Sequence, residues 1–219
     1  MSAPAKLVLM IVAAVALATA PAQARPRLGI EAYGGWSLYA MSDVNDSLSS
    51  FNRQIGTNLD PIHSGPAWGL SLRIWPHSDL LLRLGFESLT AQSEDSGIRF
   101  DLGTHLHSVS ATYFIPRQES VRYGFGVGLS QYYPSGAIAV SGASLPTSGE
   151  GFGGHVTAEG IVPMTAGWSL NGILGYRWGR VDNMRFDGTY SAIDTDYSGL
   201  FLRIGIAGEI ERRRETPSP

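Results

Sequence analysis

The sequence contains no cysteine and a single lysine, Lys6, in 219 residues. The absence of cysteine excludes a disulfide scaffold, thiol catalysis and thiolate metal sites. Charged residues make up 16% of the chain, whereas roughly 25% is usual for a soluble domain. With 16 basic against 19 acidic residues, and no basic run beyond the three arginines at 212–214, the chain lacks the basic surface of a nucleic-acid-binding protein. This shortage of charge suggests that water does not surround the protein on every side.

The first 24 residues predict a secretory signal peptide. Lys6 precedes an apolar run at 7–18, and the Ala-Gln-Ala sequence at 22–24 is a small-x-small cleavage site. The apolar run is too short to cross a bilayer, which weighs against the alternative of an uncleaved membrane anchor. We expect export through the inner membrane, cleavage after Ala24, and no transmembrane helix in the mature chain.

Eight segments follow in which every second residue is apolar, the pattern of β-strands that have one apolar and one polar face. These segments are 28–40, 67–75, 80–90, 100–115, 123–133, 154–162, 168–180 and 199–210. In the fourth segment the alternation changes phase near His107, and a β-bulge would explain the change.

Short and long connections alternate between these segments. The short ones are 76–79, 116–122 and 163–167, and the long ones are 41–66, 91–99, 134–153 and 181–198. Tight turns at one end and long loops at the other are typical of outer-membrane barrels, in which the short turns face the periplasm. The sequence therefore predicts an all-β fold, an eight-stranded antiparallel up-and-down transmembrane β-barrel over 25–210, followed by a polar periplasmic tail at 211–219.

The distribution of charge predicts which strand face lies outside. The polar faces carry four arginines and four glutamates, and the other faces carry almost no charge. A soluble, lipocalin-like cup, the alternative barrel, would need many lysines on its outer face. An outer face in hydrocarbon accounts for their absence, because Arg or Lys at the middle of a bilayer costs about 2–4 kcal/mol.

Aromatic residues gather near both ends of the predicted strands. Trp75, Tyr123 and Trp168 lie near the short turns, and Trp36, Tyr39, Trp68, Tyr132, Tyr133, Tyr176 and Trp178 lie near the long loops. Two such groups predict aromatic girdles at the two membrane interfaces. Aromatic residues scattered through the core of a soluble sandwich are the alternative, which leaves the missing lysines unexplained.

Eight strands enclose an interior that side chains are able to fill. We expect a buried ion-pair network there, formed by Glu31, Arg73, Arg83, Glu87, Glu159, Arg177, Arg203 and Glu209. Glu31 is expected to face Arg73, and Glu87 to face Arg177 and Arg203, since an unpaired charge would carry a desolvation cost of several kcal/mol. The alternative role for these residues is a selectivity lining. Four inward apolar residues leave room for a narrow apolar passage: Leu81, Ile161, Ile173 and Phe201.

The first long loop predicts a short helix at 42–56. Ser42 is suited to the N-cap, Asp43 to the first turn, and Gly56 is a stop signal. Apolar residues recur at helical spacing at Val44, Leu48, Phe51 and Ile55. We expect this helix to cap the barrel mouth, with lipid headgroups as the alternative site for its apolar face. The loops at 135–153 and 182–198 are rich in Gly, Ser, Thr and Asp, and we expect them to be mobile.

Histidine is a candidate catalytic residue at five positions: His63, His77, His105, His107 and His155. His105 and His107 share one strand face with Asp101, and such a pair is able to act as a base or to bind a metal. The sequence shows no clear orienting carboxylate and no metal-ligand motif of recognised spacing. We predict no enzyme activity, no catalytic or metal-ligating residues and no cofactor.

The signal peptide, the eight segments, the opening Ala-Tyr-Gly-Gly-Trp at 32–36 and the closing Gly-Leu-Phe-Leu-Arg-Ile-Gly-Ile at 199–206 resemble outer-membrane β-barrel-domain, or porin-family, proteins. That family includes the small barrels of outer-membrane proteins A, X and W. The resemblance implies a Gram-negative outer membrane, contact with its lipid and lipopolysaccharide, and insertion by periplasmic chaperones and the barrel-assembly machinery. In the family the last strand usually ends in an aromatic residue, whereas here it ends at Ile210 and a polar tail follows.

The expected function is that of an integral outer-membrane protein with a closed, salt-bridged lumen. Its role would be structural, or an interaction at the cell surface through the long loops, whose ligand the sequence does not identify. Transport of small hydrophobic molecules, as the resemblance to outer-membrane protein W implies, is the alternative. A lipid A-modifying enzyme is the third alternative.

Overall fold

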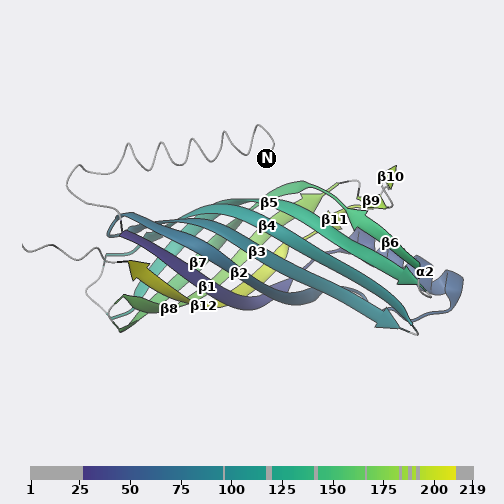
Figure 1. Ribbon diagram of the computed structural model, residues 1–219, viewed down its shortest axis with the longest axis horizontal. Helices are drawn as coiled ribbons and strands as arrows, with labels where there is room; N and C mark the ends of the chain where they lie inside the picture. Colours follow the sequence, from purple (N-terminus) through teal and green to yellow (C-terminus); the bar gives the residue numbers. More distant parts are fainter. Residues whose placement is uncertain are drawn as a thin grey trace, which may run out of the picture.

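The computed structural model describes residues 27–95, 97–116, 120–140, 143–165, 167–182, 184–186, 189–190 and 193–210. Eight long strands in this part of the chain form a closed barrel (Figure 1). They are β1 (Arg27–Leu38), β2 (Ser64–His77), β3 (Leu80–Asp95), β4 (Ile98–Phe114), β5 (Arg122–Val140), β7 (Gly151–Thr165), β8 (Trp168–Val181) and β12 (Gly199–Ile210). Each strand is antiparallel to its neighbour in this order, and β12 pairs with β1. The predicted eight-stranded antiparallel barrel is confirmed. The predicted signal peptide and polar tail lie outside the described residues.

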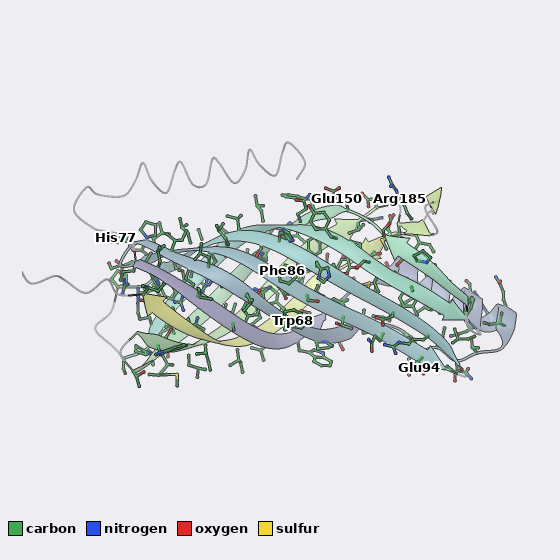
Figure 2. The ribbon with its side chains drawn as sticks, viewed as in Figure 1. Trp68, His77, Phe86, Glu94, Glu150 and Arg185 are labelled. Atoms are coloured by element: carbon green, nitrogen blue, oxygen red, sulfur yellow. The ribbon has the colours of Figure 1, made fainter. Side chains whose placement is uncertain are left out.

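The remaining elements are α2 (Ser42–Ile55) and the short strands β6 (Ala143–Ser148), β9 (Arg185–Phe186), β10 (Thr189–Tyr190) and β11 (Thr195–Asp196). They lie at one end of the barrel, which we call the cap end (Figure 1). The opposite end carries the turn at Ser78 and Asp79 and is called the turn end. Figure 2 places Glu94 at the cap end and His77 at the turn end. Among the described residues, no helix has the length and apolar character needed to cross a membrane.

Two of the predicted long loops are mostly strand. β3 continues to Asp95 and β4 begins at Ile98, with Gly97 at φ +81° in the turn between them. Glycine adopts that left-handed conformation without steric cost. β5 continues to Val140 and pairs with β6, so the segment expected to be a loop at 135–153 is mostly strand in its described part. In Figure 1, β3, β4, β5 and β6 extend beyond the rest of the barrel toward α2. The backbone there satisfies its hydrogen bonds in a sheet, although the sequence has the composition of a loop.

The β-bulge predicted near His107 is also wrong. β4 keeps an unbroken register with β3 and β5 along nearly its whole length. Its inward side chains are apolar near the cap end (Phe100, Leu102, Leu106) and polar farther down (Ser108, Ser110, Thr112), and its outward side chains change from Arg99 and Asp101 to Val109 and Ala111. Near the cap end the inward face of β4 is apolar and its outward face is polar, and farther down the strand the reverse holds. This exchange along a regular strand explains why the alternation of apolar residues changes phase in the sequence.

The outer surface of the barrel is a broad apolar band. On β1, β2, β7 and β12, the side chains that alternate outward along the described strands include no charged residue. Many large apolar side chains on this surface are strongly exposed, among them Ile30 at 60%, Phe125 at 66% and Ile204 at 59%. On β3, β4 and β8, outward charges occur only toward the cap end, at Glu94, Arg99, Asp101 and Arg180. An apolar surface of this extent indicates contact with an apolar environment.

Candidate functional site in the barrel interior and its cap

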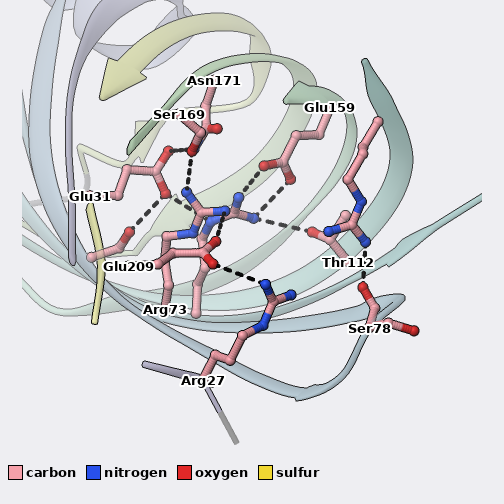
Figure 3. A network of polar contacts seen from close by, with 12 residues as sticks. Arg27, Glu31, Arg73, Ser78, Thr112, Glu159, Ser169, Asn171 and Glu209 are labelled. Atoms are coloured by element: carbon pink, nitrogen blue, oxygen red, sulfur yellow. Dashed lines mark hydrogen bonds and ion pairs between the residues drawn. The ribbon is translucent and has the colours of Figure 1, made fainter. Parts of the chain in front are cut away.

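Arg83 of β3 binds Glu31 and Glu159, which Figure 3 shows on different sides of the polar network in the barrel interior. Its Nε donates a hydrogen bond to Oε2 of Glu31 on β1, and its Nη1 donates to Oε2 of Glu159 on β7, both at 2.9 Å. Nη1 also donates to Oγ1 of Thr112 at 3.2 Å. All three charged side chains are buried. A buried charge without a partner is strongly destabilising in a low-dielectric interior, so each of these three side chains needs its ion-pair partner.

Arg73 of β2 completes this group from the turn end. Its Nη2 lies 3.7 Å from Oε1 of Glu209, and its Nη1 donates to Oγ of Ser169 at 3.4 Å. Glu209 also pairs with Arg27 at 3.3 Å, nearer the barrel rim. We call Glu31, Arg73, Arg83, Glu159 and Glu209 the Arg83 cluster.

Among the described residues, Glu31 forms its direct ion pair with Arg83 of β3, and its predicted partner Arg73 forms its direct ion pair with Glu209. The register of β1 against β2 places Ser71 opposite Glu31 and Gly29 opposite Arg73. Glu31 instead accepts hydrogen bonds from Ser71 at 3.1 Å and from Asn171 at 2.7 Å, in addition to that from Arg83. Alternation identifies which residues face the interior, but register and barrel curvature decide which of them meet.

A second group of charges, which we call the Glu87 cluster, consists of Glu87, Arg177 and Arg203. Arg177 donates from Nη2 to Oε1 of Glu87 at 2.9 Å, and Arg203 donates to the other carboxylate oxygen. The ring of Phe201 lies under both guanidinium groups, with ring-centre distances of 4.5 Å to Arg177 and 4.3 Å to Arg203. Arg177 also donates to Oγ of Ser37 at 3.2 Å. These contacts hold Glu87 between two arginines that come from β8 and β12.

An apolar cluster fills the interior at the turn end. Trp75, Leu81, Phe114 and Ile161 are buried together, and the rings of Trp75 and Phe114 are 5.3 Å apart. The guanidinium group of Arg122 lies 4.7 Å from the ring centre of Trp75. This cluster occupies the end through which a solute would have to leave the barrel.

The four inward apolar residues from which the sequence suggested a narrow passage do not form one cluster among the described residues. Leu81 and Ile161 belong to the apolar cluster at the turn end. Ile173 and Phe201 are buried but belong to neither of the two apolar clusters of the described residues. Phe201 is in addition covered by guanidinium groups. The inward apolar residues therefore serve local packing in separate places.

Tyrosines close the interior toward the cap end. The rings of Tyr132 and Tyr197 stack with centres 5.4 Å apart, and Tyr39 meets Tyr197 edge to face at 6.0 Å. The hydroxyl groups of Tyr197 and Thr104 are 2.5 Å apart and share a hydrogen bond. The ring of Tyr132 fills the space that Gly179 leaves, since a Cβ on that glycine would lie 2.3 Å from a ring carbon.

The helix α2 caps the barrel above these tyrosines. It begins at Ser42 with Met41, not Ser42, at the N-cap, and it ends before Gly56, which has φ +73°. Val44 and Leu48 are buried in the apolar core of the cap end, and Phe51 packs against that core. The expected capping position is therefore observed. Ile55, by contrast, is exposed.

Two asparagines of α2 hold the chain segment that follows the helix. Asn45 exchanges two hydrogen bonds with the backbone of Ile62, at 3.0 and 2.7 Å. Asn52 exchanges two with the backbone of Leu59, both at 2.9 Å. Each amide thus satisfies one backbone N–H and one C=O in the manner of a neighbouring strand. The polar face of the helix is therefore in part a surface that binds backbone.

Three of the predicted girdle residues lie inside the barrel. Tyr39, Trp75 and Tyr132 are at most 5% exposed. Each lies two residues along the chain from an inward residue: Ser37, Arg73 or Ser130. Because side chains of a strand alternate between its two faces, this spacing already predicted that the three aromatic side chains point inward. Position near a strand end, the basis of the prediction, does not determine the face.

The other predicted girdle residues point outward. Tyr133 is partly exposed, and about half of each remaining side chain is exposed: Trp36, Trp68, Tyr123, Trp168, Tyr176 and Trp178. Tyr113, absent from the predicted girdles, is 57% exposed and pairs in register with Leu80 near the turn end. It belongs with Tyr123 and Trp168 in the group at that end.

His105 and His107 face outward and pack among aromatic rings. His105 stacks on Phe86 at 5.4 Å, and His107 meets Tyr133 edge to face, also at 5.4 Å. The carboxylate of Asp101, on the same face of β4, binds Arg99 at 3.0 Å. Within the described ranges, no three or more His, Asp or Glu residues are grouped so as to hold a metal ion.

Sequence reasoning missed a buried Ser–His pair in the interior. Ser130 Oγ lies 3.3 Å from Nδ1 of His155, and both side chains are at most 6% exposed. The ring of His155 also meets Phe201 edge to face at 6.3 Å. Only the register of β5 against β7 brings these residues together, so no local pattern in the sequence signals the pair. The pair lies buried beside the Glu87 cluster, since Phe201 contacts both His155 and the two arginines of that cluster.

Solved structures of outer-membrane proteins have a similar architecture. No protein-family model matches the chain, and no curated protein matches it in sequence. Among solved structures, it is similar to a major outer membrane protein from Thermus thermophilus, with 14% identity, a TM-score of 0.54, and coverage of 85% of this chain and 100% of the other. It is also similar to the outer membrane protein AlkL in lipid bilayers, with 12% identity, a TM-score of 0.51, and coverage of 89% and 96%. At these identities the likeness concerns the fold, and the chain has the fold of a small outer-membrane β-barrel.

Proposed function

We propose that the protein is an integral outer-membrane protein with a closed lumen, and that the cap end is its functional surface outside the cell. The observation that carries this proposal is the Arg83 cluster, in which one guanidinium group binds carboxylates from two other strands across the interior. Such contacts occupy the cross-section that a channel would need. The interior of an eight-stranded barrel is only wide enough for its own side chains.

The apolar band supports a site in the membrane. Its outward residues carry no charge on β1, β2, β7 and β12 within the described strands, and outward charge begins only toward the cap end. Outer-membrane barrels likewise have an outward apolar band of limited height, with charged residues outside it. The proposal includes export by the signal peptide at 1–24, insertion by the barrel-assembly machinery, contact with lipid and lipopolysaccharide, and a polar tail at 211–219 in the periplasm.

Three layers support a closed lumen. The apolar cluster lies at the turn end, the two charged clusters lie along the interior, and the tyrosines lie below α2. Transport of small hydrophobic molecules would need a continuous apolar route, and the inward apolar residues do not supply one. We propose no enzymatic role, because the Ser130–His155 pair is enclosed in the interior.

Planar-bilayer conductance of the refolded protein tests the closed lumen. A heat-modifiability gel establishes first that a barrel has formed. We expect no stable conductance steps from the folded protein, and measurable leakage from the triple variant Glu31→Ser, Arg83→Ser, Glu159→Ser, which empties the centre of the Arg83 cluster. Stable steps from the unmodified barrel would refute the closed lumen and make transport the better assignment.

A further inference from the structure

An apolar cavity lies beneath α2 at the cap end. Its volume is about 190 Å³, and Val44, Leu48 and Phe51 of the helix form one wall while Phe100 and Leu102 of β4 form another. Interiors of proteins are normally packed without voids larger than a water molecule. A dry apolar cavity of about 150 Å³ is large enough to bind benzene. The volume beneath α2 therefore fits a molecule of about six to nine non-hydrogen atoms.

Three hydroxyl groups line this cavity. That of Ser47 donates to the backbone oxygen of Asp43 at 2.8 Å, and the other two give the cavity its polar feature. Thr147 of β6 and Thr195 of β11 line it and are 6% and 1% exposed. Neither hydroxyl has a hydrogen-bond partner within the described part of the chain. A buried hydroxyl without a partner is costly, because its hydrogen bonds to water are lost on burial. A bound molecule with a polar atom near these threonines would satisfy them.

The charge of the lining restricts the ligand further. Among the described residues, none that lines the cavity carries a charge, so they would leave a bound carboxylate or ammonium group without a counterion, which is strongly unfavourable. We infer that the cavity beneath α2 binds a small neutral molecule that has an apolar body and one hydrogen-bonding group, such as an aliphatic alcohol or a phenol.

The position of the cavity indicates that the ligand arrives from water. Phe100 and Leu102 alternate along β4 with Arg99 and Asp101, which face outward as an ion pair at 3.0 Å. The side chains of that pair are 50% and 39% exposed, so this level of the barrel lies beyond the apolar band. A lipid tail in the bilayer does not reach it. The inference goes beyond the proposed function, because binding beneath α2 does not depend on whether the lumen is open or closed.

Methionine methyl groups provide a direct test. Met184 lines the cavity, whereas Met164 is 58% exposed on the outer surface near the turn end. The full-length protein is labelled with ¹³C-methyl methionine, refolded into lipid nanodiscs and titrated with 1-hexanol. We expect the Met184 signal to shift in a saturable way and the Met164 signal to change only in proportion to hexanol in the lipid. Hexanoate has the same number of carbon atoms but carries a negative charge, and we expect it to leave the Met184 signal unchanged.

Variants assign the binding to this cavity. Val44→Phe fills the cavity and is expected to abolish the saturable shift. Thr147→Val and Thr195→Val keep the shape and remove the hydroxyl groups, and each is expected to weaken hexanol binding about fivefold, the size of one lost hydrogen bond. Ser93→Ala is the matched control, because Ser93 is also a buried hydroxyl without a partner among the described residues but does not line the cavity.

Several results would overturn the inference. They are a non-saturable Met184 shift, equal binding of hexanoate, and threonine variants that bind hexanol as tightly as the Ser93→Ala control. If Val44→Phe fails to fold on a heat-modifiability gel, the near-isosteric threonine variants still decide the question. A conducting barrel would refute the proposed function and leave the Met184 result unaffected, so the two failures are distinguishable.

Discussion

Replacing Arg83 with methionine tests whether the interior charges hold the barrel together. The guanidinium group of Arg83 is bound by the carboxylates of Glu31 and Glu159, and all three side chains are buried. Removing one partner of a buried ion pair costs about 3–5 kcal/mol, because the remaining charge has lost both water and its counterion. Here two carboxylates lose the same partner, so we expect a loss of at least about 3 kcal/mol, which is more than a hundredfold in the folding equilibrium.

The matched control for Arg83→Met is Arg99→Met. Arg99 forms an ion pair with Asp101 at 3.0 Å, but these side chains are 50% and 39% exposed. Exposed pairs contribute about 0–1 kcal/mol. Urea-induced unfolding from lipid vesicles, followed by tryptophan fluorescence, gives the free energy of unfolding of both variants. Equal losses in the two variants would refute the reasoning.

A triple variant separates loss of the pair from loss of the side chain. In Arg83→Met combined with Glu31→Gln and Glu159→Gln, no carboxylate is left without a counterion at this site. Replacing a whole buried ion pair by uncharged groups is often neutral, whereas removing one member is not. We expect the triple variant to recover more than half of the stability lost in Arg83→Met. A triple variant no more stable than the single one would show that packing, not charge, is the contribution of Arg83.

Two further predictions concern the outer surface and the packing of the interior. Ile204→Arg places a charge in the middle of the apolar band and should lower the free energy of unfolding in lipid by about 2–4 kcal/mol. The control is Gln92→Arg, on the outward face near the cap end, which should have little effect. Equal effects of the two variants would contradict a lipid-facing band. Gly179→Val should destabilise the barrel by about 1–3 kcal/mol through overpacking, because its Cβ would lie 2.3 Å from the ring of Tyr132. Gly172→Val is the control in the same urea titration, since a Cβ at Gly172 meets no atom within 4 Å, and a loss as large as that in Gly179→Val would argue against steric conflict.

The barrel was predictable from the sequence because the alternation of apolar and polar residues is a local signal. Each of the eight segments is found as a strand, and the helix predicted at 42–56 is observed at Ser42–Ile55. The signal failed where the environment changes along a strand. From position 91 to position 102 the outward residues Gln92, Glu94, Arg99 and Asp101 are polar, while the inward residues Ile98, Phe100 and Leu102 are apolar. A sequence pattern that assumes one solvent for each strand face interprets this exchange as a loop or a bulge.

The contacts within the site were less accessible from the sequence. Parity placed Glu31, Arg73 and Arg83 on the inward face, but only the register of three strands shows that Glu31 meets Arg83. The cavity beneath α2 likewise depends on how the helix, β4 and β11 converge, because Val44, Phe100 and Thr195 are far apart in the chain. Local periodicity contains no information about such convergence.

The ion pairs of the interior also bear on how such a barrel is completed. Glu31 with Arg83, Arg83 with Glu159, and Glu87 with Arg177 and Arg203 all join strands that are not neighbours in the sheet. No hairpin is able to form them alone, so a partly assembled sheet would present unmatched charges to the hydrocarbon of the membrane. The pairs that join β3 to β7, β8 and β12 form only once the sheet has curved round to bring these strands opposite one another. The network thus penalises a sheet that has not yet closed and favours a transition in which curvature and closure occur together.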